Sequence, residues 1–217
     1  MKRICDATRR AIKTIGIAAT ATLFLQPAGY AQTIIDEWAA VQAPAAPALK
    51  AVKVDPKTSA LLVLDLLKQS CNAERRPRCV ASIPNIVKLL DGARTHHVTV
   101  FHSRFPGPKP EDVLPEVAPK GEEPSVSALS DKFIGTDLEK MLKDKGITTV
   151  IIVGTAAHGA VLYTASSAAM RGFEVVVPLD GVSAENTYAE QVAAWLLTSA
   201  PTISSKVSLT KIDLIGY

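Results

Sequence analysis

The stretch from Thr148 to Pro178 constrains the fold more than any other part of the chain, because it has the pattern of a strand, a turn, a helix and a second strand. Residues 150–153 are a continuous run of apolar β-branched side chains, as in a strand buried on both faces, and Gly154 ends the run. Residues 160–171 have helical spacing, Gly172 ends that pattern, and residues 174–177 predict the next strand. Such a unit is a right-handed crossover in a parallel sheet, and ligands of parallel sheets bind at the carboxyl ends of the strands. We therefore expect the functional site at the turn of residues 154–160.

The other periodic segments continue this alternation of strands and helices. Apolar runs predict strands at residues 60–66, at residues 98–102 and near residue 207. Amphipathic spacing predicts helices at residues 83–96, 136–145 and 188–198. In the second of these helices we expect Thr136 as the N-cap and Glu139 as its capping-box partner. The predicted fold is α/β, a doubly wound, Rossmann-like and mostly parallel sheet with helices on both faces.

Residues 1–31 have the pattern of an export signal peptide. Five basic residues lead, residues 14–25 are mostly apolar, and residues 29–31 offer small side chains around a cleavage point. The pair Arg9-Arg10 also resembles a twin-arginine signal, so both the general secretory and the twin-arginine route stay open. We expect an exported protein, periplasmic or secreted.

Two further regions follow the signal. Residues 32–57 are rich in Ala and Pro and predict an extended N-terminal arm. This arm either lies across the surface of its own domain or contacts a second subunit of a homo-oligomer. Residues 58–217 form the predicted folded domain. The whole chain has 24 Lys and Arg and 21 Asp and Glu; without the five bases and one acid of residues 1–31, 19 and 20 remain, a net charge of about −1. This balance argues against a nucleic-acid partner, and no later segment is apolar enough for stable membrane insertion.

Cys71 and Cys79 are the cysteines that remain beyond the signal. Two cysteines eight residues apart in an oxidising compartment usually form a disulfide, which is our expectation here. A free, reactive Cys71 near the end of the first strand is the alternative. Neither cysteine has histidine or cysteine partners at ligand spacing, so we predict no zinc site.

The stretch that begins at Gly154 resembles the isochorismatase-like cysteine hydrolases. The residues that match the family pattern are Gly154, Val161, Thr164, Ala165, Arg171, Gly172, Phe173 and Asp180. The family's nucleophilic cysteine falls on Ala160. A methyl group has no lone pair, so covalent thiol catalysis is excluded at this position.

The same resemblance implies a catalytic Asp65 at the end of the strand ALLVLDL. The alternative is a structural role, in which the Asp65 carboxylate accepts hydrogen bonds from backbone amides at the strand end. The family's catalytic lysine precedes a motif that survives here in part as Lys132-Phe133-Ile134-Gly135-Thr136, and counting back puts the lysine position at about Ser127. Lys132 and Lys120 do not fall at that position. We therefore expect this lysine to be lost. Lys68, three residues after Asp65, is a possible substitute that is more often a solvated surface charge.

Further candidates are expected around the same rim. His102 ends the second strand beside Arg104, and His158 lies in the turn itself. In this interpretation either histidine serves as an acid, a base or a hydrogen-bond donor. The alternative for His102 is a structural residue at the strand end, and the alternative for His158 is an exposed turn residue. The backbone amides of Gly159 and Ala160 form a potential oxyanion site. Arg104 is a candidate for holding a ligand carboxylate, or an exposed loop arginine.

The sequence predicts neither a metal nor an organic cofactor. The residues after the first strand contain no histidine where the family's metal-binding members have one, and dinucleotide, phosphate-loop and serine-elbow motifs are missing. Two functions fit what remains. One is a hydrolase with thiol-independent chemistry on a small carboxylate, vinyl ether or amide, with Asp65 as acid and base; the other is an inactive protein that binds a small ligand.

Overall fold

The computed structural model describes residues 33–217, so the predicted signal at residues 1–31 lies outside the described residues. The chain divides into two units at residue 43. In the first unit, residues 33–43 contain the short helix α1 (Ile34–Glu37) and a 3₁₀ turn (Trp38–Ala40), all exposed to solvent. The second unit, Pro44–Tyr217, contains the sheet and the candidate site.

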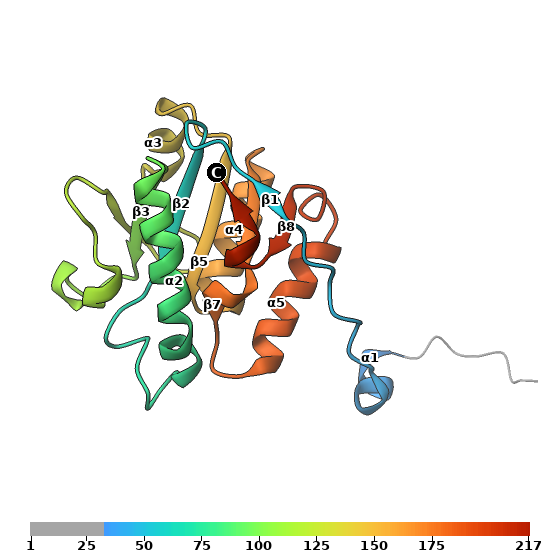
Figure 1. Ribbon diagram of the computed structural model, residues 1–217. Coiled ribbons are helices and arrows are strands. Elements are labelled where there is room, and N and C mark those ends of the chain that lie inside the picture. Colours follow the sequence, from blue (N-terminus) through green and yellow to red (C-terminus); the bar gives the residue numbers. More distant parts are fainter. Residues whose placement is uncertain (1–32) are drawn as a thin grey trace, which may run out of the picture. The chain divides into compact units, whose positions relative to one another are not determined.

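The main sheet of the second unit is parallel throughout (Figure 1). Its strand order is β4-β3-β2-β5-β6-β8, with the short β7 paired to β5. The bounds are β2 (Ser59–Leu64), β3 (Thr99–Arg104), β4 (Ser125–Ser127), β5 (Thr149–Thr155), β6 (Glu174–Pro178), β7 (Val182–Ser183) and β8 (Val207–Thr210). This confirms the predicted doubly wound α/β fold. The order reverses between β2 and β5, and ligands of such sheets bind at that switch point.

Helices cover both faces of the sheet. On one face, α2 (Pro77–Thr95) packs against Leu61 and Val63 of β2; on the other, α3 (Leu138–Asp144), α4 (Leu162–Met170) and α5 (Thr187–Ser199) pack against Leu62 and Leu64. Alternate residues of each buried strand therefore contribute to two separate cores, as the two-residue period of a strand requires. We call these the α2 face and the α4 face.

Three element boundaries differ from the sequence prediction. Helix α2 begins at Pro77, six residues before the expected start, because Pro fits the first turn of a helix. The helix after β5 begins at Leu162, since the preceding residues 157–161 form a π-helical turn. Asp137, not Thr136, is the N-cap of α3, and Glu139 bonds to Lys143 and Arg171 instead of closing a capping box.

Two segments close the α2 face. The Pro-rich residues 105–124 fold into two 3₁₀ turns, Pro110–Asp112 and Pro115–Val117, and bury Val117. Strand β1 (Val52–Lys53) pairs in parallel with β9 (Ile215–Gly216) in a separate two-stranded sheet. Part of the predicted arm thus belongs to the same unit as the main sheet.

Candidate active site

Asp65 and Lys132 form a buried ion pair at the end of β2. Lys132 Nζ lies 2.7 Å from Asp65 Oδ2, and the Ser103 hydroxyl donates a hydrogen bond of 2.8 Å to Asp65 Oδ1. Lys132 is fully buried. Asp65 adopts a left-handed backbone conformation (φ +55°), which turns the chain sharply after the strand. The carboxylate is thereby held by a cation and a hydroxyl at the switch point of the sheet.

Counting along the motif predicts that the lysine is lost at Ser127, but Asp65 has a lysine partner in the structure, Lys132. Ser127, the position that the sequence count indicates, is an exposed residue at the end of β4. Lys132 provides an ammonium group to Asp65 from five residues further along the chain. Its position directly before the buried Phe133 was a usable signal, because a lysine in a buried segment needs an anionic partner.

The loop that carries Lys132 is fixed by hydrogen bonds on both sides. Lys132 Nζ also donates to the carbonyl oxygens of Ala128, at 2.9 Å, and Leu129, at 2.6 Å, so all three of its protons have acceptors. The Lys132 backbone N–H donates to Thr164 Oγ1 in the first turns of α4. The ammonium group is therefore held in one place before any ligand binds.

Burial shifts both members of the pair toward their neutral forms. Burial raises the pKa of Asp65, while the charge and hydrogen bond of Lys132 and the Ser103 hydroxyl oppose that rise. Burial likewise lowers the pKa of Lys132, against the opposing charge of Asp65. A proton on Asp65 is thus more accessible near neutral pH than on a carboxyl in water, which suits a general acid.

The turn after β5 lies directly beside this pair. Gly154 has φ +125°, and a Cβ atom there would stand 2.1 Å from the carbonyl oxygen of Leu64, the residue before Asp65. The peptide bond between Thr155 and Ala156 is cis. Ala160 is 6% exposed and packs in the core of the α4 face, so a methyl group occupies the family's thiol position.

The proposed oxyanion donors are brought only partly to the site. The Gly159 N–H donates to the carbonyl oxygen of Ala156 at 2.9 Å, so this donor is already used. Helix α4 starts two residues after Ala160, which removes the expected helix N-terminus from residues 159 and 160. The turn is a π-helical turn because Val161 N–H reaches back to the same Ala156 carbonyl.

His158 lies in a second polar cluster at the ends of β5 and β7. Its Nε2 atom lies 3.9 Å from Glu185 Oε2, and its side chain is 46% exposed. Glu185 is paired with Arg76, whose Nη1 also donates to Thr155 Oγ1 at 2.9 Å. Sequence reasoning missed Arg76; its place between the two cysteines was the available signal.

His102 and Arg104 do not point to Asp65, which corrects the expectation for both. His102 Nε2 lies 2.8 Å from Glu123 Oε2, and Arg94 binds the same carboxylate with two nitrogens at 2.8 Å each. Arg104 Nη1 donates to the carbonyl oxygen of Pro108. Because successive side chains of a strand point to opposite faces, Ser103 reaches Asp65 while its two neighbours face the other way.

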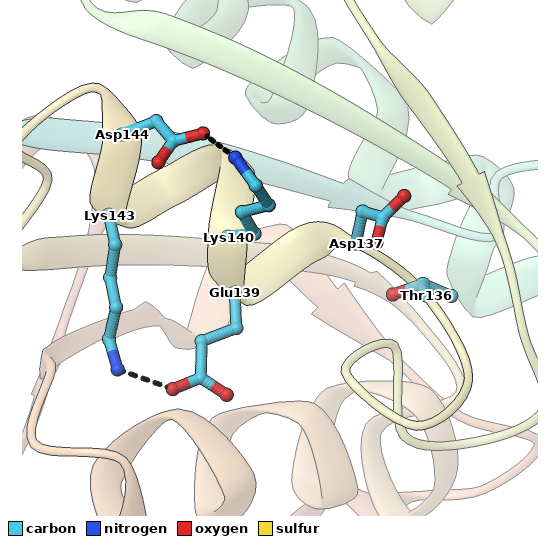
Figure 2. Close-up of a pocket in the computed structure, with 6 residues that line it drawn as sticks. All are labelled: Thr136, Asp137, Glu139, Lys140, Lys143 and Asp144. Atoms are coloured by element: carbon cyan, nitrogen blue, oxygen red, sulfur yellow. Dashed lines mark hydrogen bonds and ion pairs between the residues drawn. The ribbon is translucent and has the colours of Figure 1, made fainter.

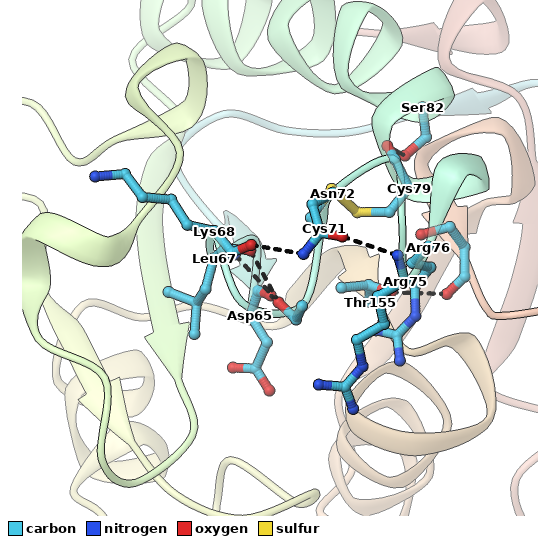
Figure 3. Close-up of a disulfide and its surroundings, with 12 residues drawn as sticks. Asp65, Leu67, Lys68, Cys71, Asn72, Arg75, Arg76, Cys79, Ser82 and Thr155 are labelled. Atoms are coloured by element: carbon cyan, nitrogen blue, oxygen red, sulfur yellow. Dashed lines mark hydrogen bonds between the residues drawn. A yellow bond between two sulfur atoms is a disulfide. The ribbon is translucent and has the colours of Figure 1, made fainter.

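The disulfide and Lys68 flank the site on the side of α2. Cys71 and Cys79 form a disulfide with a Cα–Cα distance of 5.3 Å, as expected from their spacing, so a free Cys71 is excluded. Lys68 Nζ donates to the carbonyl oxygen of Glu111, and Figure 3 shows its side chain extending away from the Asp65 carboxylate. Lys68 is therefore not the partner of Asp65.

A further polar hollow is lined by residues of α3 and by the two residues before it, Thr136 and Asp137. Figure 2 shows its lining side chains, in which Lys140 pairs with Asp144 and Lys143 with Glu139. These are exposed pairs one helical turn apart, which solvent screens and which carry little energy. Among residues 33–217, no cluster of three His, Cys, Asp or Glu side chains is placed to hold a metal ion. No helix in the same range is long and apolar enough to cross a bilayer.

Comparisons with known proteins agree on one family. The family model described as the isochorismatase domain matches residues 59–206. The secreted isochorismatase effector Isc1 of Verticillium dahliae is 31% identical over 113 residues, 47% of this chain and 60% of the effector, so the match spans less than two thirds of that relative. The uncharacterised isochorismatase family protein YwoC of Bacillus subtilis is 26% identical over 159 residues, 62% of this chain and 82% of the relative.

Solved structures support the same fold. An isochorismatase family protein from Desulfovibrio vulgaris superposes with a TM-score of 0.66 at 16% identity, covering 72% of this chain and 95% of its own. At that identity the likeness concerns the fold alone. The family model, in contrast, covers more than half of the chain, including Asp65, Lys132 and the turn at Ala160. The chain belongs to the isochorismatase family.

Proposed function

We propose that this protein is a hydrolase that uses the Asp65–Lys132 pair for proton transfer and needs no thiol. The observation that supports this most is the fully buried Lys132 ammonium 2.7 Å from Asp65 Oδ2. A protein that only binds a ligand has no need of such a pair, and burying two charged groups is costly. The pair is therefore better explained by chemistry than by stability.

The substrate class that fits is a small vinyl ether that carries a carboxylate. Hydrolysis of a vinyl ether begins with proton transfer to carbon, which requires an acid and no nucleophilic side chain. Asp65 donates its proton to the terminal vinyl carbon, whose π electrons form the new C–H bond, and an oxocarbenium ion develops at the ether carbon. Lys132 stabilises the carboxylate that Asp65 becomes. Water adds to the cation, its proton returns to Asp65, and the hemiketal separates into a ketone and an alcohol.

Amides and ureido acids are the less favoured substrates. Their usual route in this family would need a nucleophile at residue 160, which is alanine. With Asp65 as a general base, a water molecule would have to attack the carbonyl carbon, and one expected oxyanion donor, the Gly159 N–H, is already bonded. We therefore place amide hydrolysis second.

Purified protein spanning residues 32–217, with its disulfide formed, tests the proposal. We expect it to turn over isochorismate, to leave nicotinamide and ureido acids unchanged, and to lose activity by about 10²-fold or more on Asp65→Asn. The matched control is Asp91→Asn, since Asp91 is exposed on α2 and its nearest basic group, Lys120 Nζ, is 3.9 Å away. A ligand that stabilises the protein and is recovered unchanged would instead indicate a binding protein. Fast amide hydrolysis by Ala160→Cys from an inert parent would also contradict thiol-independent chemistry.

We further propose that the protein acts after export. The Cys71–Cys79 disulfide suits an oxidising compartment, and the relative from Verticillium dahliae is described as secreted. Fractionation of cells that produce the full chain should recover it outside the cytoplasm and without residues 1–31. Full-length protein retained in the cytoplasm would refute this part.

A further inference from the structure

Arg76 is the most unusual charged residue that the proposed chemistry does not use. It lies within the nine-residue segment 71–79 that the disulfide closes, directly before the first turn of α2. Its side chain is 6% exposed, whereas its carboxylate partner Glu185 is 41% exposed. A guanidinium this deeply buried normally has acceptors for its donors, because unpaired buried donors are unfavourable.

One donor of Arg76 lacks an acceptor. Arg76 Nη1 donates to Thr155 Oγ1 and Nη2 to Glu185, but Nε is buried and has no hydrogen-bond partner among residues 33–217. Nε and Nη2 form the edge of a guanidinium that binds a carboxylate with two parallel hydrogen bonds. Glu185 therefore occupies half of a carboxylate-binding edge, with a single oxygen.

The surroundings of Arg76 belong to the same switch point as Asp65. Thr155 follows Gly154, which is paired with Leu64 in the sheet, and Asp65 is the residue after Leu64. Figure 3 draws Asp65, Thr155 and Arg76 in one close-up. The Thr155 hydroxyl, which accepts from Arg76, donates in turn to the carbonyl oxygen of Ser183 on β7. The Ser183 hydroxyl is also buried without a partner in the described part of the chain. Together with His158, which is 3.9 Å from Glu185, Arg76 makes this cluster suited to an anion.

We propose that Arg76 binds the carboxylate of the substrate through Nε and Nη2, with the half-exposed Glu185 moving aside. This rests on the proposed function, because it assigns the carboxylate of that substrate to a place beside the Asp65–Lys132 pair. The Arg76 guanidinium fixes the anionic end, while Asp65 faces the group that accepts the proton. Bidentate recognition also selects a planar carboxylate over a neutral carboxamide of the same shape.

The disulfide acquires a role through this assignment. Segment 71–79 is attached to the ends of β5 and β7 by Arg76, and to α5 by Arg78, which binds Glu190. The bond between Cys71 and Cys79 restricts the segment before ligand arrives, so less conformational freedom is lost on binding. Reduction should therefore weaken carboxylate binding while the sheet stays folded.

The test compares a matched pair of probes, 2-methoxyacrylate and 2-methoxyacrylamide, which differ in the carboxylate alone. Binding is measured by ligand-detected NMR titration to the parent and to Asp65→Asn, in which the acid is removed. We expect both proteins to prefer the carboxylate, and Arg76→Gln to weaken its binding about tenfold or more with little effect on the amide. Arg75→Gln is the control, because Arg75 lies in the same segment and is exposed. Arg76→Lys should recover only part of the affinity.

A second variant keeps the assignment testable if the Arg76 variants fail to fold. Glu185→Gln removes the competing carboxylate from a half-exposed position, and it should tighten carboxylate binding by about three- to tenfold. A purely structural Arg76–Glu185 bridge predicts the opposite sign. The paired change Cys71→Ser and Cys79→Ser should weaken carboxylate binding by several-fold.

The outcomes separate this inference from the proposed function. Selective binding that depends on Arg76, without turnover by the parent, would support the inference and refute the hydrolase. Turnover of isochorismate, with equal loss of both probes in the Arg76 and Arg75 variants, would support the hydrolase and refute the inference. Unchanged or weaker carboxylate binding by Glu185→Gln would also overturn the assignment.

Discussion

Two adjacent residues of β3 face two buried charge networks on opposite sides of the sheet. On the α4 face, Ser103 donates to Asp65, which is paired with Lys132. On the α2 face, His102 bonds to Glu123, which Arg94 holds with two hydrogen bonds. Both networks contain one carboxylate and one cation. Asp65 has one further donor, Ser103, whereas Glu123 has two, His102 and the Lys120 backbone N–H.

The two carboxylates nevertheless differ in protonation. Burial raises the pKa of Asp65 more than its partners lower it. Burial also raises the pKa of Glu123, but hydrogen bonds from Arg94, from the Lys120 backbone N–H and from His102 outweigh it and lower the pKa to about 2. Deeper burial and fewer hydrogen bonds to the charged form thus distinguish Asp65, whose pKa is raised, from Glu123, whose pKa is lowered. This contrast predicts that mutations on the α4 face change activity and mutations on the α2 face change stability.

Lys132→Met should produce the largest effect. We expect the rate of the chemical step to fall by about 10²- to 10⁴-fold, since the carboxylate left after proton transfer loses its cation. The pKa of Asp65 should rise further, so the variant should be less stable at pH 8 than at pH 5. Steady-state kinetics and thermal unfolding at both pH values measure this. Lys140→Met, which breaks an exposed pair on α3, is the control. Retained activity in Lys132→Met would contradict a catalytic role for the Asp65–Lys132 pair.

Arg94→Met should be the largest change on the other face. The substitution removes the cation that binds Glu123 with two hydrogen bonds. Because the Glu123 carboxylate then has no cationic partner, we expect a loss of about 2–3 kcal/mol in the free energy of unfolding. Turnover per folded molecule should stay within about threefold of the parent. Denaturant unfolding with activity assays checks both, and Lys88→Met, an exposed pair, is the control. Greater loss of activity than of stability would show that the α2 face takes part in catalysis.

The acid dependence of stability should come partly from Glu123. Its pKa is about 2 in the folded protein and about 4.5 when unfolded, so the charged form stabilises the fold above pH 4.5. That contribution is lost as the pH falls from 4.5 toward 2, and we expect it to amount to about 1–2 kcal/mol after solvent screening. Chemical unfolding across this range should show a flatter curve for Glu123→Gln than for the parent. Parallel curves would assign the acid sensitivity to other groups.

Ser103→Ala should have the smallest effect. It removes one hydrogen bond to the charged form of Asp65, worth about 1 kcal/mol, so the pKa of Asp65 should move up. The pH–rate profile should shift to higher pH, with a change in maximum rate below about fivefold. His102→Asn, one residue away, should change stability and leave the profile in place. A shifted pH–rate profile in His102→Asn would show that the α2 face also influences the pKa of the catalytic acid.

The sequence was sufficient for the fold and for the place of Asp65 at the end of a buried strand, but not for the residues that contact Asp65. Apolar runs and the residues after Gly154 predict the parallel sheet because burial on both faces leaves a continuous signal. Motif counting indicates Ser127 for the lysine, because a long flexible side chain can reach the same point from another backbone position. His102 and Arg104 were misplaced for a different reason: sharing a strand end does not fix which face a side chain points to. Arg76 depends on a loop closure that no periodicity reveals.

Gly154 limits which residues of this site can be mutated without disrupting the fold. Its φ of +125°, together with the 2.1 Å that would separate an added Cβ from the Leu64 carbonyl oxygen, leaves room for hydrogen alone. A library that randomises this codon would therefore consist mostly of misfolded variants. Ala160, six residues on, already carries a Cβ atom, but it is 6% exposed and packs in the core of the α4 face, so it is suited to small replacements such as Ser or Cys. A screen for new activities should keep the glycine fixed and vary residue 160.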